Sequence, residues 1–290
     1  DLGERILQLM NLKPAHIVVP AAHITRDEVG ELFEKDGISK DIGNHDPTYL
    51  TQCARYSLRQ EFIEADAGMT GCNFGVASTG DCVVCTNEGN ADMSTSIPKL
   101  HIVSMGIDKV IPNYDALAVF QRLLARSATG QPSVSFTSQF RKARPGAEMH
   151  VILVDNGRSN IIADQLHWRT AKCIRCGACM NTCPVYRRSM GYSYNYFIPG
   201  PIGINLGMVH NPKKHSGNVS ACSLCLSCDL VCPVKVAPGS QIYYWRQALE
   251  GFGTENKEKK YMSVAMTELY QHPAIYSVAT KYAHFANIIP

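Results

Sequence analysis

The sequence lacks a long apolar run. No stretch approaches the roughly 18 uninterrupted apolar residues that a membrane-spanning helix needs, and its best runs, such as residues 116–120, are short. It also lacks an excess of charge of one sign, because its net charge is only +3, so no nucleic-acid-binding surface is expected. Finally, it contains no glycine-rich dinucleotide motif, no phosphate-binding P-loop and no H-E-x-x-H zinc motif. With no recognisable flavin or nicotinamide motif, two-electron chemistry would fall to another subunit.

What the sequence has in excess is cysteine, with 12 in 290 residues. Eight of them form two quartets of the pattern C-x2-C-x2-C-x3-C-P: Cys173, Cys176, Cys179 and Cys183 before Pro184, then Cys222, Cys225, Cys228 and Cys232 before Pro233. This run is typical of ferredoxins with [4Fe–4S] clusters, in which the fourth cysteine binds the other cluster. We therefore predict two [4Fe–4S] clusters with crossed ligand sets, Cys173, Cys176, Cys179 and Cys232 for one, and Cys222, Cys225, Cys228 and Cys183 for the other.

Two other interpretations of the quartets are weaker. Structural zinc uses four ligands per site, usually from paired C-x2-C knuckles, and the repeated third and fourth cysteines exceed what zinc needs. Disulfides require an oxidising compartment, and C-x2-C spacings make poor structural bridges. With eight cysteines assigned to clusters, the composition indicates a reducing cytosol.

The length of the chain predicts two domains. The first, residues 1–165, alternates strands and helices and is predicted to be α/β with a substantially parallel sheet. We expect strands at residues 16–19, 81–86, 100–105, 134–136 and 150–154, and helices at residues 26–35, after Asp46-Pro47, and from Asn113 to Gly130. The turn sequence Asp155-Asn156-Gly157 ends the last strand.

The second domain, residues 166–250, holds both quartets. The segment between them, residues 184–221, is rich in Gly, Tyr, Pro and Asn and is predicted to be an irregular loop around the clusters. Its length, together with helical sequence at residues 241–249, favours a helical type of ferredoxin module. A tail at residues 251–290 is predicted to be helical, with one break at Pro273.

Other candidate residues have two interpretations each. Cys82 and Cys85 lie in a predicted strand with side chains on opposite faces, so we interpret them as buried fillers. The turns at Thr79-Gly80 and at residues 87–90 bracket that strand and are either a binding site or simple turn chemistry. Basic side chains beside the first quartet either offset the negative charge of a cluster or dock an acidic partner: Arg175, Arg187 and Arg188. A further basic group is either an anion site or solvated: Arg122, Arg126, Lys142 and Arg158.

Matching segments in order along nearly the whole chain carry a family resemblance: residues 1–4, 14–20, 77–80, 87–90, 124–130, 155–158, 173–179 and 199–203. The chain resembles the lactate utilisation protein B family, iron–sulfur subunits of a bacterial L-lactate-oxidising system. The resemblance implies an α/β LUD domain, related to the sugar-isomerase and CoA-transferase superfamily, followed by an α-helical two-[4Fe–4S] ferredoxin domain. Family members carry a longer N-terminal region, so this chain is expected to be part of a longer protein.

The resemblance also implies a function and partners. It implies a cytoplasmic subunit of an L-lactate dehydrogenase complex, which acts with one cysteine-rich and one LUD-domain companion and passes electrons to a downstream acceptor. Relatives usually have an acidic residue where this chain has Ser78, which weakens a catalytic role for the α/β domain. Two alternatives stay open. In the first, the α/β domain itself binds or transforms a small organic acid or acyl-thioester, with the clusters as redox sensor or scaffold. In the second, the chain is an assembly platform.

Overall fold

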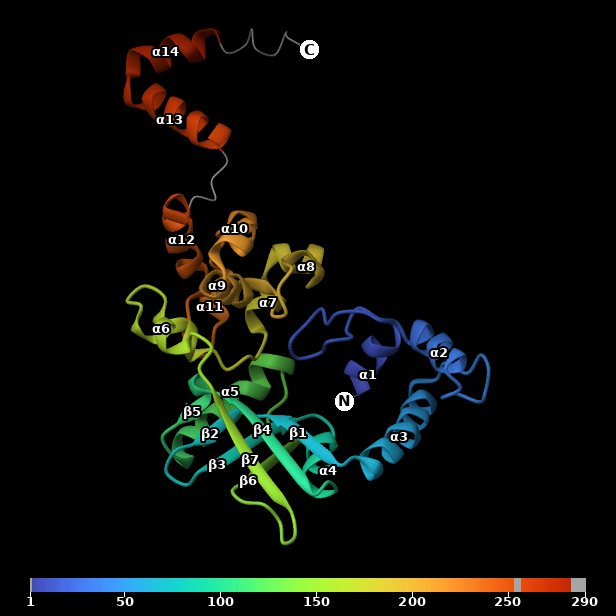
Figure 1. Ribbon diagram of the computed structural model, residues 1–290. Coiled ribbons are helices and arrows are strands. Elements are labelled where there is room, and N and C mark those ends of the chain that lie inside the picture. The colour runs from blue at the N-terminus through green and yellow to red at the C-terminus, as the bar shows by residue number, and fades with distance from the viewer. Residues whose placement is uncertain (1, 253–256, 283–290) are drawn as a thin grey trace. The chain divides into compact units, whose positions relative to one another are not determined.

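Figure 1 shows the computed structural model, which describes residues 2–252 and 257–282. The chain divides into two compact units, Asp1–Trp245 and Arg246–Pro290. Across the described ranges, no helix combines the length and the apolar character needed to cross a membrane.

The chain begins with three helices, α1 (Leu2–Leu9), α2 (Arg26–Lys35) and α3 (Pro47–Glu64). Thr25 caps the N-terminus of α2 in a capping box with Glu28. Asp46 caps the N-terminus of α3, and Pro47 occupies its first turn. The helices bury a common cluster formed by Ile6, Phe33, Leu50 and Ala54. The predictions for residues 26–35 and for the Asp46-Pro47 helix start are therefore confirmed.

The predicted strand at His16–Val19 is wrong, because this segment is an irregular loop. The His16 Nδ1 atom accepts hydrogen bonds from the backbone N–H groups of Val18 and Val19, at 2.9 and 3.3 Å. A side chain that binds its own backbone in this way competes with a strand ladder. The loop instead contacts the ferredoxin half, where the Tyr186 hydroxyl donates to the Ala15 carbonyl at 2.5 Å.

Two sheets form the α/β core. The first is fully parallel, in the order β1 (Ala67–Gly71), β4 (Leu100–Gly106) and β7 (Glu148–Val154), with Val103 opposite Thr70 and Val151. The second is mixed, in the order β5 (Val110–Ile111), β2 (Phe74–Val76), β3 (Asp81–Thr86) and β6 (Phe136–Phe140). Only its β2–β5 pair is parallel. The predicted α/β class is confirmed, whereas the strand predicted at 134–136 begins at Phe136.

The second sheet lies between the first sheet and a helix. On one side, Cys82 of β3 packs against Val103 and Met105 of β4. On the other side, Phe74 and Val83 pack against α5 (Tyr114–Thr129), which Asn113 caps and Gly130 ends with a left-handed φ of 75°. Ile174 and Cys176 of the first quartet belong to this same cluster: Phe74, Val76, Val83, Ile111, Leu117, Leu124, Ile174 and Cys176. The first quartet is thus anchored in the α/β core.

The connecting segments before the first quartet are short and partly helical. Helix α4 (Asn90–Ser96) packs beside β1, and its Ser94 carbonyl lies so near Gly68 that a Cβ there would clash at 1.7 Å. The 3₁₀ segment η1 (Ile107–Lys109) joins β4 to β5. After the Asn156-Gly157 turn, in which both residues have positive φ, α6 (Arg158–Ala163) and the 3₁₀ segment η2 (Trp168–Lys172) lead to Cys173.

The ferredoxin half is helical. Its elements are α7 (Ala178–Thr182), α8 (Pro184–Ser189), η3 (Tyr192–Tyr194), α9 (Gly200–His210), α10 (Pro212–Ala221), α11 (Ser227–Val231) and α12 (Pro238–Ala248). The prediction of an irregular loop at 184–221 is wrong. Helix α9 is buried nearly all round and therefore has no amphipathic period to reveal it. Gly203 lets its backbone pass the Ile198 carbonyl, which a Cβ would meet at 1.7 Å.

The second unit contains η4 (Leu249–Phe252), α13 (Lys257–Gln271) and α14 (Pro273–Tyr282). Pro273 begins α14 and separates it from α13, as predicted. The remainder of the predicted helical tail, residues 283–290, lies outside the described residues.

Candidate iron–sulfur centre

The two quartets have the same local backbone. Arg175 and Leu224, each two residues after the first cysteine of a quartet, both have left-handed φ angles, of 62° and 52°. Gly177 and Leu226 repeat the match one residue after the second cysteine, at 79° and 58°. In each quartet, the left-handed turn brings a backbone N–H to the first sulfur at 3.4 Å, from Arg175 to Cys173 and from Leu224 to Cys222. Hydrogen bonds to cluster sulfurs are one way in which proteins set the reduction potential.

The quartets pack against each other as equivalent halves. Helix α7 carries Cys179, the third cysteine of the first quartet, and α11 carries Cys228, the third of the second. The two helices are in contact. The hydroxyl groups of Thr182 and Ser227 form a hydrogen bond between them. The sequence repeat therefore corresponds to a structural repeat.

Cysteines from different quartets lie together in space. Cys232, the last of the second quartet, shares an apolar cluster with Cys173 and Cys179 of the first. Burial raises the pKa of the Cys176 thiol, and the neighbouring Cys173 and Cys232 raise it further. On the other side, burial followed by the nearby Cys183 and Cys222 raises the pKa of Tyr194. Cys183 of the first quartet and Cys222 of the second are thus both close enough to Tyr194 to raise its pKa. Cys225 is exposed.

The donor set near the first quartet fits an iron–sulfur cluster. Within residues 2–252 and 257–282, the structure shows no group of three His, Cys, Asp or Glu side chains placed to hold one metal ion. A [4Fe–4S] cluster is held by cysteine thiolates, and Cys173, Cys179 and Cys232 share one apolar cluster. Ile198, Ile202 and Val236 supply that apolar wall, and the Val236 N–H reaches the Cys232 sulfur at 3.2 Å.

A charged cluster joins the first quartet to the α/β core. The Asp108 carboxylate in η1, only 3% exposed, accepts a 2.6 Å bond from Arg158 Nε and lies 3.7 Å from an Arg175 nitrogen. Gly106 makes room for this pair, because a Cβ there would meet Asp108 at 2.3 Å and Arg158 at 2.6 Å. Next to it, burial and then the Arg175 charge lower the pKa of Lys109. Sequence spacing alone gave no signal for this cluster.

The basic residues predicted beside the first quartet divide into two kinds. Arg175 is directed to Asp108, whereas Arg187 and Arg188 lie on exposed positions of α8. Arg158, predicted as part of an anion site with Arg122, also pairs with Asp108. The structure therefore assigns Arg158 to the junction between the two halves.

Cys82 and Cys85 point to opposite faces of β3, as predicted, since Cys82 packs towards β4 and Cys85 towards α5. In the fold, Cys82 packs against a second thiol, that of Cys72, which lies between β1 and β2. The contact between the two thiols lowers the pKa of Cys82 to about 7, and the same contact together with burial raises that of Cys72.

The two turns around β3 do not form one site. At the start of β3, the Asp81 carboxylate is 4% exposed and accepts hydrogen bonds from the hydroxyl groups of Thr79 and Tyr114. It also accepts two from the Arg141 guanidinium group, from Nε at 2.8 Å and from Nη2 at 2.9 Å. At the other end, Glu88 accepts from the Leu2 N–H at 3.4 Å. The first turn thus forms a closed carboxylate network, and the second ties the N-terminal helix to the sheet.

We expect Asp81→Asn to destabilise the protein at pH 7 by roughly 2 kcal/mol, the value of a charge-assisted hydrogen bond. The bonds from Arg141, then Thr79 and Tyr114, hold the pKa of Asp81 well below its usual range. A carboxyl with a depressed native pKa stabilises the fold above about pH 4 and loses that contribution as pH falls further. The difference in the free energy of unfolding between wild type and variant, measured by denaturant unfolding followed by circular dichroism, should therefore stay constant down to about pH 4. Below that pH it should shrink.

The matched control is Asp115→Asn, at an exposed position of α5. An equal loss in this control would contradict the prediction.

These observations define a class of protein: an α/β domain joined to a helical module with two ferredoxin-type cysteine quartets, an iron–sulfur electron-transfer protein. The chain belongs to the LUD domain family, whose model matches residues 1–156. Residues 169–236 match the model of the 4Fe-4S dicluster domain family. Its fold class and its [4Fe–4S] clusters are thereby confirmed.

Curated relatives carry two kinds of name. The chain is 39% identical over 295 residues to "Lactate utilization protein B" of Oceanobacillus iheyensis, which covers 99% of this chain and 61% of that relative. It is 38% identical over 286 residues to "Uncharacterized electron transport protein YkgF" of Escherichia coli K12, covering 96% and 59%. The chain thus spans less than two thirds of the length of these relatives. No solved structure matches it significantly.

Proposed function

We propose that this protein is the electron-transfer subunit of a cytoplasmic complex that oxidises L-lactate to pyruvate. The observation that carries the proposal is the pair of equivalent quartets, which pack through α7 and α11 and bring Cys232 of the second beside Cys173 and Cys179 of the first. The names of the relatives, which refer to lactate utilisation and to electron transport, support the same function.

Within this function, the eight quartet cysteines are the ligands. Cys173, Cys176, Cys179 and Cys232 hold one cluster, and Cys222, Cys225, Cys228 and Cys183 hold the other. Each [4Fe–4S] cluster supplies a one-electron step, so that two adjacent clusters drain a two-electron donor. Ile198, Ile202 and Val236 form an apolar wall that excludes water. The backbone N–H groups of Arg175, Leu224 and Val236 donate hydrogen bonds to the sulfurs of Cys173, Cys222 and Cys232, respectively.

The oxidation itself is assigned to companions. A cysteine-rich subunit and a second LUD-domain subunit are the proposed partners, together with a downstream electron acceptor. Arg187 and Arg188, exposed on α8 beside Cys183, offer a basic surface for an acidic partner.

The test is anaerobic iron and sulfide analysis, followed by EPR of the dithionite-reduced protein and by addition of L-lactate with and without the partners. We expect about eight irons per chain, two interacting signals, and reduction by lactate only with partners. Reduction of the isolated chain by lactate would make the α/β domain the dehydrogenase. Zinc in place of iron would contradict the electron-transfer function.

A further inference from the structure

A pocket of about 330 Å³ lies where the α/β core meets the first quartet. One wall comes from η1 and β5, and the opposite wall from η2 and the start of the first quartet, including Cys173. A molecule in this pocket would touch a proposed ligand of the first cluster directly.

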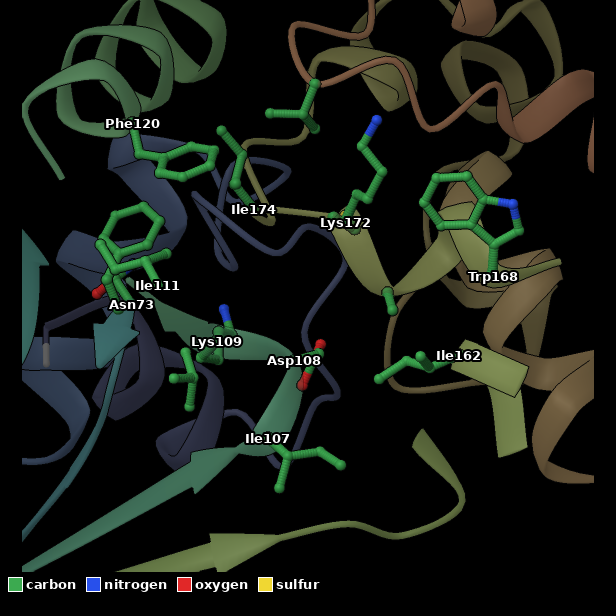
Figure 2. Close-up of a pocket in the computed structure, with 15 residues that line it drawn as sticks. Asn73, Ile107, Asp108, Lys109, Ile111, Phe120, Ile162, Trp168, Lys172 and Ile174 are labelled. Atoms are coloured by element: carbon green, nitrogen blue, oxygen red, sulfur yellow. The ribbon is translucent and has the colours of Figure 1, made fainter. Parts of the chain in front are cut away.

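The walls of this pocket are mainly apolar and aromatic. Phe74 and Phe120 stack with their ring centroids 5.5 Å apart and line one side. Figure 2 shows Phe120 and Trp168 on opposite sides of the hollow. The remaining apolar lining comes from Ile107, Val110, Ile111, Ile162, Ala171, Ile174 and Val234. Such walls favour a flat, conjugated ring over a small hydrated acid, because aromatic faces stack on rings at little desolvation cost.

One positive charge in the pocket makes no close ion pair. The Lys109 ammonium makes no hydrogen bond or close ion pair with any residue that the structure describes, whereas its neighbour Asp108 is occupied by Arg158 and Arg175. Figure 2 shows Lys109 and Asp108 side by side at the base of the hollow. A second amine, that of Lys172, lies at the rim over Trp168, 5.7 Å from the ring centroid. The Lys109 ammonium shares its nearest carboxylate, Asp108, with two arginines, so it suits an oxygen that becomes negative.

We propose that this pocket binds a planar, fused-ring electron carrier of the quinone or flavin class, with Lys109 facing the oxygen that gains negative charge on reduction. The proposal rests on the electron-transfer function proposed above and names the site where electrons enter or leave the first cluster. In the outward direction, two reduced clusters each lose one electron, and the carrier gains two electrons and two protons from water. Two carbonyl groups of a quinone become hydroxyl groups, or one flavin ring becomes its dihydro form.

The first experiment measures binding without electron transfer. The chain has two tryptophans, so Trp245→Phe leaves Trp168 as the reporter. Anaerobic titration of the oxidised, cluster-loaded protein with 1,4-naphthoquinone-2-sulfonate or with FMN should quench Trp168 fluorescence saturably, and the arm that saturates identifies the source of the ring. Lys109→Met should weaken binding about tenfold, the effect of one charge-assisted hydrogen bond, whereas Lys142→Met, at an exposed position, should not. Val110→Phe, at a residue 47% exposed that lines the pocket, should abolish quenching while the iron content is unchanged.

The second experiment measures electron transfer. After reduction by dithionite and removal of its excess, the bound carrier should restore the visible cluster absorption at a rate that saturates with carrier concentration. A rate that never saturates, or that Lys109→Met and Val110→Phe leave unchanged, overturns the pocket as the site but leaves the electron-transfer function standing. Displacement of the ring by L-lactate or pyruvate overturns it in favour of an organic-acid site. A protein without iron would instead overturn the proposed function itself.

Discussion

Cys183→Ser is expected to remove one cluster, lowering iron from about eight to about four atoms per chain. The cluster lost should be the one built on Cys222, Cys225 and Cys228, although Cys183 belongs to the other quartet in sequence. The reason is spatial. Cys183 and Cys222 are both close enough to Tyr194 to raise its pKa, while Cys232 packs with Cys173 and Cys179. Cys53→Ser, on α3 and outside both quartets, is the control that should keep all the iron.

Double variants decide the ligand sets by iron analysis alone. If the sets are crossed, Cys183→Ser with Cys222→Ser removes two ligands of one cluster and retains about four irons, whereas Cys183→Ser with Cys173→Ser removes a ligand from each cluster and retains none. If each quartet held its own cluster, the two results would be exchanged. EPR of the retained cluster should then show a single signal without magnetic interaction.

Asp108→Ala is expected to destabilise the protein by about 3–5 kcal/mol, the usual effect of removing one partner from a buried ion pair. The substitution leaves the guanidinium groups of Arg158 and Arg175 beside each other, with the Lys109 ammonium nearby and no carboxylate in contact. Arg175 already has one buried nitrogen, Nη1, with no hydrogen-bond partner in the described part of the chain. Denaturant unfolding followed by circular dichroism measures the loss.

Two further variants interpret that result. Asp108→Asn keeps a side-chain oxygen but removes the charge, so its effect should be smaller than that of Asp108→Ala. Glu148→Gln removes an exposed pair with His150 at 3.2 Å and should change stability by less than about 1 kcal/mol. If Asp108→Ala behaved like Glu148→Gln, the charged cluster would not hold the two halves together.

The sequence predicted elements whose signals are local. Asn113 and Gly130 mark the two ends of α5 by their own side-chain and backbone chemistry, and the structure places both at those ends. The sequence prediction was wrong for two segments whose structure depends on contacts with the rest of the protein. Helix α9 is buried on every face, so its apolar and glycine residues resemble a loop. The His16–Val19 segment has the composition of a strand, but the His16 ring binds its own backbone N–H groups instead.

The candidate site shows the same division. The cysteine spacing predicted the clusters, because that signal is local: both quartets have the same left-handed turn, at Arg175 and at Leu224. The contacts between distant segments could not be predicted from spacing. Asp108 meets Arg175 only because β4 ends beside the first quartet, and Cys72 meets Cys82 only after two strands pair. Neither pairing leaves a periodic pattern in the chain.

The packing of Cys232 against Cys173 and Cys179 has a consequence for biosynthesis. Cys232 is the last of the eight quartet cysteines to leave the ribosome. With crossed ligand sets, neither cluster can gain its fourth thiolate before the second quartet is translated: Cys228 completes one set and Cys232 the other. A nascent chain that ends between the quartets would therefore present open thiols, and neither cluster could be completed until the second quartet emerges.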